Sequence, residues 1–142
     1  MTVSLLRRTL LTIALLGGSA AAHAEVVVVM SARSNIATLS KAQVSQIFLA
    51  KSAALPDGSR ATPVDQTDGS AVRNDFYTRV AGKDAAQMRA YWSQLMFTGK
   101  AQRPKQLAND AAVVAAVAAS PGTIGYVNAA AVNSSVKVVL QP

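Results

Sequence analysis

Residues 64–76 read Val-Asp-Gln-Thr-Asp-Gly-Ser-Ala-Val-Arg-Asn-Asp-Phe, and this stretch predicts a strand that turns directly into a helix. A short β-favouring run leads into the turn. Val72, Phe76 and Val80 follow it at the four-residue spacing of one helix face. We therefore expect the turn Asp68-Gly69-Ser70 to lie where a strand ends and a helix begins.

This turn has two interpretations. The first amides of a helix have no intrahelical acceptor, and the helix dipole adds partial positive charge there. Gly69 lets the backbone approach a ligand, Ser70 adds a hydroxyl group, and Arg73 adds a cation one turn later, which together suit an oxyanion site. The alternative is that Asp68 or Ser70 only caps the helix, a common role for both residue types. The candidate ligand-binding residues are therefore Asp68, Gly69, Ser70 and Arg73.

The first 24 residues have the pattern of a cleaved signal peptide. Arg7 and Arg8 precede an apolar run over residues 10–16, and Ala22-His23-Ala24 forms a small-residue cleavage site. The alternative is a retained membrane anchor, for which the apolar run is short. We expect a protein exported to the periplasm, with residues 25–142 as a single domain large enough for its own core.

The composition of residues 25–142 argues against most enzyme chemistry. The one histidine, His23, lies in the signal segment, and the sequence has no cysteine. The usual bases and nucleophiles are therefore missing, and we predict neither enzymatic activity nor a cofactor. Asp65, Asp68 and Asp75 form the one close group of carboxylates, which is too few oxygen ligands for a predicted metal site.

The charge balance favours anionic partners in general. Residues 25–142 contain 12 basic and 7 acidic residues, a net charge of +5. The basic residues are scattered and aromatic residues are few, so we predict no nucleic-acid partner. Within residues 100–107, which we expect to be a loop, Lys100, Arg103 and Lys105 could form a basic docking patch or simply face solvent.

The order of the predicted elements is β-α-β-α-α-α-β-β. This order predicts a three-layer α/β/α sandwich with a mostly parallel or mixed sheet. The expected strands are residues 25–30, 60–65, 123–127 and 136–140, and the expected helices are residues 40–51, 70–82, 84–99 and 109–120.

Several local signals support these boundaries. Ser40 with Gln43, and Asp84 with Gln87, match capping boxes at two helix starts. Gly125 inside a strand predicts a bulge or a close approach of another element. The apolar stripe of the third helix should face the core rather than a ligand; it comprises Met88, Tyr91, Trp92, Leu95 and Met96.

Three motifs occur in series and together indicate a family. They are Leu39-Ser40-x-x-Gln43-x-x-x-Ile47-Phe48, then Asp68-Gly69-Ser70 with Phe76 six residues after Ser70, and finally Pro121-Gly122-Thr123-Ile124-Gly125-Tyr126-Val127. This series resembles the phosphate-type periplasmic substrate-binding proteins of ABC transporters, which have the type II binding-protein fold. The resemblance covers most of residues 26–128.

The resemblance implies a function and a site. Members of that family close two lobes on phosphate, whereas 118 residues suffice for one lobe. By position, Asp68, Gly69 and Ser70 would contact the oxyanion, and Arg73 would substitute for an arginine that the family often has before the turn. We expect weak binding of phosphate or a similar small oxyanion, or a site completed by a homodimer or by a periplasmic or membrane protein. The alternative is a protein-interaction module that kept the lobe and lost its ligand.

Overall fold

The computed structural model describes residues 25–142 as a mixed α/β domain, and the predicted signal peptide lies outside this range. The fold class predicted from the sequence is confirmed. The elements in chain order are β1 (Val26–Ser31), α1 (Lys41–Phe48), β2 (Thr62–Gln66), α2 (Ala71–Ala81), α3 (Ala85–Phe97), β3 (Lys105–Leu107), α4 (Asp110–Ala119), β4 (Thr123–Asn128), a 3-10 turn (Ala129–Ala131) and β5 (Val136–Leu140).

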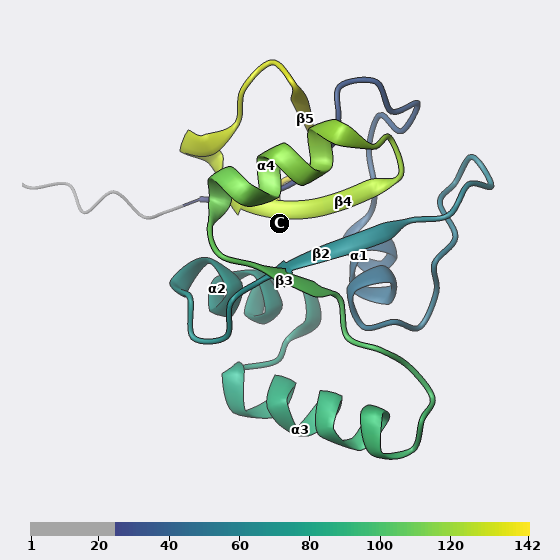
Figure 1. Cartoon of the computed structure of the whole chain (residues 1–142), viewed down its shortest axis with the longest axis vertical. Helices are drawn as coiled ribbons and strands as arrows, with labels where there is room; N and C mark the ends of the chain where they lie inside the picture. Colours follow the sequence, from purple (N-terminus) through teal and green to yellow (C-terminus); the bar gives the residue numbers. More distant parts are fainter. Residues whose placement is uncertain (1–24) are drawn as a thin grey trace, which may run out of the picture.

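The five strands form one mixed sheet in the order β3-β2-β4-β1-β5. β2 pairs in parallel with β3 and β4, while β1 pairs antiparallel with β4 and β5. Figure 1 shows α4 on one side of the sheet and α1 and α2 on the other, with α3 beyond α2. Within residues 25–142, no helix has the length and apolar character that a membrane span requires.

Strand β1 supplies both faces of the core. All six of its residues are buried, as expected for a continuous run that begins with four β-branched valines. Val28 and Met30 pack in the larger cluster, beneath α1 and α2, whereas Val27 and Val29 pack in a valine-rich cluster under α4. One short strand therefore holds the helical layers to opposite faces of the sheet.

Three sequence-based expectations are wrong in detail. Part of the expected loop over residues 100–107 forms β3, a three-residue strand with no buried residue, whose only strand partner is β2. Helix α1 ends at Phe48 rather than near Lys51, because Ala50 adopts a left-handed φ of 57° and the chain turns there. Met96 does not join the core and is 54% exposed, because it lies at the end of α3, where the next residue, Phe97, is 93% exposed.

The local signals that define the other boundaries are confirmed. Both capping boxes are formed, at Ser40 and at Asp84. Gly125 marks a close approach: a Cβ at this position would lie 2.5 Å from Cγ1 of Val113 and 3.1 Å from a methyl of Val117. The strand thus has no side chain where α4 presses closest to the sheet.

This close approach makes Gly125→Ala destabilising. We expect the overlap with Val113 to lower the free energy of unfolding by about 1–3 kcal/mol, the usual range for overpacking a core, as measured by urea denaturation. The same substitution in a Val113→Ala background should cost less, because the nearest methyl group is gone. An equal cost in both backgrounds would contradict this account of Gly125.

Candidate functional site

The turn before α2 is built by its own backbone and by Ser70. The amide of Ser70 donates to the carbonyl of Thr67 at 3.1 Å, and Gly69 between them has a φ of 86°, which favours glycine. The hydroxyl oxygen of Ser70 accepts from the amide of Arg73 at 3.1 Å. Ser70 is therefore the N-cap of α2.

Two amides at the start of α2 remain free for a ligand. Within residues 25–142, neither Ala71 nor Val72 donates its amide to any acceptor. Both residues line an open pocket of about 190 Å³. The other residues that line it are Glu25, Val26, Asp75, Arg79 and Asn128. Arg79 is paired with Asp75 at 2.8 Å, so this pocket holds no unpaired arginine, and Glu25 adds a second carboxylate to it.

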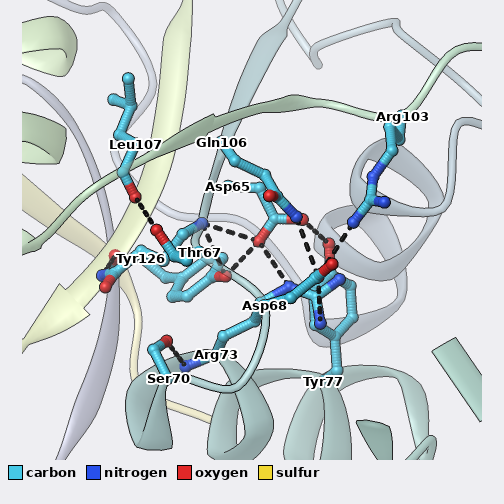
Figure 2. Close-up of polar contacts among 11 residues, drawn as sticks. Asp65, Thr67, Asp68, Ser70, Arg73, Tyr77, Arg103, Gln106, Leu107 and Tyr126 are labelled. Atoms are coloured by element: carbon cyan, nitrogen blue, oxygen red, sulfur yellow. Dashed lines mark hydrogen bonds and ion pairs between the residues drawn. The ribbon is translucent and has the colours of Figure 1, made fainter. Parts of the chain in front are cut away.

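Asp68 already holds the side-chain donors of this region. Three nitrogens converge on its Oδ1 atom: Arg73 Nη1 at 3.3 Å, Arg103 Nη2 at 3.0 Å and Gln106 Nε2 at 2.9 Å (Figure 2). Partial burial acts to raise the pKa of Asp68, but the Gln106 hydrogen bond and the two arginine charges outweigh it and leave the pKa below its ordinary value. The chain's own carboxylate thus occupies donors that an external oxyanion would use.

Arg73 is directed into the protein rather than toward a solvent-facing ligand. Its side chain is 2% exposed, and its Nε atom lies 3.4 Å from Asp65 Oδ1. Its guanidinium group lies 5.0 Å from the centre of the Tyr77 ring. Asp65 and Asp68 therefore converge on a cation, and that cation is Arg73.

Asp65, at the end of β2, is the buried centre of the network. Tyr77 of α2 donates to its Oδ2 atom at 2.8 Å, and the hydroxyl group of Tyr126 in β4 donates to Oδ1 (Figure 2). The amide of Gln66 also donates to Oδ1 at 2.9 Å. The Tyr126 ring stacks on Phe76, with 3.9 Å between ring centres. The carboxylate therefore ties together β2, β4 and α2.

The structure brings together only part of the site predicted from the sequence. Asp68 and Arg73 form an ion pair, Ser70 caps the helix that carries Arg73, and Gly69 shapes the turn. Sequence reasoning missed the residues that complete the network: Tyr77, Arg103, Gln106 and Tyr126. The one available signal was Tyr126, which lies in an otherwise apolar strand. A buried tyrosine hydroxyl group needs a hydrogen-bond partner, so Tyr126 could have predicted a polar group nearby.

Comparisons with solved structures identify the fold. A protein from Clostridium perfringens, described as a phosphate ABC transporter substrate-binding protein with bound phosphate, has a TM-score of 0.65 and 18% identity. An ABC-type phosphate transport receptor from Vibrio cholerae has a TM-score of 0.64 and 12% identity. A possible phosphate-binding protein from Planctomyces limnophilus has a TM-score of 0.60 and 19% identity.

The likeness covers one half of these proteins. Each comparison takes in 81% of this chain but only 44%, 45% and 40% of the three proteins in turn. No protein-family model matches the sequence, and the search of curated proteins finds no significant match. The chain therefore has the fold of about half of a phosphate transporter's substrate-binding protein, as its sequence motifs predicted.

The buried tyrosines predict a specific response to alkaline pH. Burial, followed by the charge of Asp65, raises the pKa of Tyr77 and of Tyr126 far above the ordinary value near 10. In the unfolded chain both would ionise near pH 10, so above that pH the folded state binds more protons and loses stability as the pH rises. We expect phenolate absorbance at 295 nm from these two residues to appear only together with loss of the circular dichroism of the fold.

Tyr91 provides the control for this titration. It lies outside the Asp65 network and is less buried, although burial also raises its pKa. A Tyr91→Phe variant leaves Tyr77 and Tyr126 as the remaining tyrosines. Two phenolates forming near pH 10 in that variant, with the circular dichroism unchanged, would show that the network does not hold the two protons.

Proposed function

We propose that this chain is an exported periplasmic binding module for phosphate or a similar small oxyanion, related to the substrate-binding components of ABC transporters. Its fold supports this proposal, because it matches about half of a phosphate ABC transporter substrate-binding protein, of a phosphate transport receptor and of a possible phosphate-binding protein. The observation that carries it is the pair of amides of Ala71 and Val72, which have no acceptor among residues 25–142 and directly follow Ser70 at the start of α2.

The donors at this position suit an oxyanion. The Ser70 oxygen accepts from Arg73, so its own proton remains available to a ligand. The amides of Ala71 and Val72 point out of the helix start, where the dipole favours negative charge. Phosphate would thus be held by three donors of the turn, with Asp68 as a nearby competitor for charge.

These donors support weak binding. Hydrogen bonds to a charged group contribute roughly 1.5–3 kcal/mol each before the entropy of capture is subtracted. A dissociation constant near 1 mM corresponds to about 4 kcal/mol, and one near 1 μM to about 8 kcal/mol. With three donors and no free arginine, we expect a dissociation constant for phosphate in the millimolar range. Tighter binding would require further donors from a homodimer or from a second protein.

Ser70→Asp tests the site directly. Aspartate is as good an N-cap as serine, so α2 should persist, while the added negative charge should abolish phosphate binding. Nuclear magnetic resonance titration with phosphate should shift the Ala71 and Val72 amides of the wild-type protein and leave them unmoved in the variant. Ser70→Thr keeps the hydroxyl group and should still bind; unchanged binding in Ser70→Asp would refute the site.

Asp68→Asn tests the competition. Without this charge, Asp68 no longer neutralises Arg73 and Arg103, and both can attract an external anion. We expect phosphate to bind about tenfold more tightly, the effect of roughly one charge-assisted hydrogen bond. Asp84→Asn makes the same change of charge at the N-cap of α3, where asparagine also caps well, and should leave affinity unchanged. Equal affinities for phosphate in the wild type and in Asp68→Asn would show that Asp68 does not compete with the ligand.

A second candidate function is protein interaction without a small ligand. Phe97, at the end of α3, is 93% exposed, and Met96 beside it is 54% exposed. Both line an open surface with Trp92 and Arg103. If saturating phosphate moved no amide of the α2 turn, this apolar end of α3 would become the better-supported working surface, with a homodimer or another periplasmic protein as its partner.

A further inference from the structure

We propose that this protein has a second anion-binding site, separate from the α2 turn, that takes a small oligophosphate. The site is a groove of about 480 Å³ between the loop after α1, the chain entering β2 and the loop after α3. These segments lie on the right of the view in Figure 1. Each contributes one cation, and we name the cationic groove by these three residues: Lys51, Arg60 and Lys100.

The three cations are free to meet a ligand. Among residues 25–142, no ion pair or side-chain hydrogen bond engages Lys51, Arg60 or Lys100, and each is exposed. No acidic residue lines the groove. Uncompensated charge of one sign in a concave surface concentrates the electrostatic potential and raises the local concentration of counter-ions.

Hydrogen bonds fix the backbone of the three segments that carry the cations. At the end of α1, the amide of Lys51 donates to the Gln46 carbonyl at 2.9 Å, after the left-handed residue Ala50. Arg60 lies in an isolated antiparallel bridge with Ala54. The amide of Lys100 donates to the Leu95 carbonyl at 3.2 Å, closing the end of α3. The cations therefore extend from three segments whose backbones are hydrogen-bonded.

The shape and charge of the groove indicate the class of ligand. Its volume is in the range of small-molecule sites, which span about 300–1,000 Å³. Cations on three separate segments suit an anion whose charges are spread over several linked groups, and single phosphate suits them less. The groove shares no lining residue with the pocket beside Ala71 and Val72, so the two sites can be tested independently.

Calorimetric titration of the purified protein with tripolyphosphate, at low salt and without divalent metals, tests the proposal. We expect tripolyphosphate to bind at least tenfold more tightly than inorganic phosphate. Each of the substitutions Lys51→Ala, Arg60→Ala and Lys100→Ala should weaken it about tenfold, as expected for one charge-assisted contact. Lys41→Ala, at the start of α1 and outside the groove, removes one charge and should change nothing.

The result must also be assigned to the correct site. The Ser70→Asp variant should bind tripolyphosphate like the wild type, even if phosphate binding at the α2 turn is lost or never occurs. Loss of tripolyphosphate binding in Ser70→Asp would assign it to the α2 turn and overturn the proposal. No binding at millimolar tripolyphosphate would overturn it too, as would equal weakening by Lys41→Ala, which would indicate diffuse attraction of any polyanion, such as an oligonucleotide.

Discussion

The burial of the Asp65 carboxylate is the constraint on which the rest of the site depends. A charge removed from water costs several kcal/mol unless hydrogen bonds and an opposite charge replace the solvent. Here Tyr77, Tyr126 and Arg73 supply that replacement from α2 and β4. The end of β2, the start of α2 and the middle of β4 must therefore come together in one arrangement for the charge to be tolerated.

This constraint decides what the α2 turn can offer a ligand. Arg73 is committed to Asp65 below it and to Asp68 beside it, so its charge is already balanced by two carboxylates. The donors that remain available to a ligand are the amides of Ala71 and Val72 and the hydroxyl proton of Ser70. A binding module built in this way would discriminate by the geometry of its backbone donors more than by net charge.

The sequence predicted the features that are local in the chain. The two capping boxes and the valine-rich strand β1 each follow from residues within a few positions of one another. It failed where the cause is distant: β3 exists because β2 pairs with it, and Arg103 and Gln106 reach Asp68 across 35 and 38 residues. The choice between capping and oxyanion binding at Ser70 could not be made from spacing, since both roles use the same residue in the same place.

A net positive charge likewise does not reveal where an anion would bind. Of the cations near Asp68 and Asp75, Arg73, Arg79 and Arg103 are all paired with aspartates. Three of the cations without an ion pair line the cationic groove, although the sequence presents them as unrelated basic residues separated by up to 49 positions. The turn Asp68-Gly69-Ser70, the strongest sequence signal for an oxyanion site, thus lies beside carboxylates. Cations without an ion pair come together only through folding, where three separate segments line the cationic groove. The two proposals therefore place the attraction of charge and the recognition of a small oxyanion in pockets that share no lining residue.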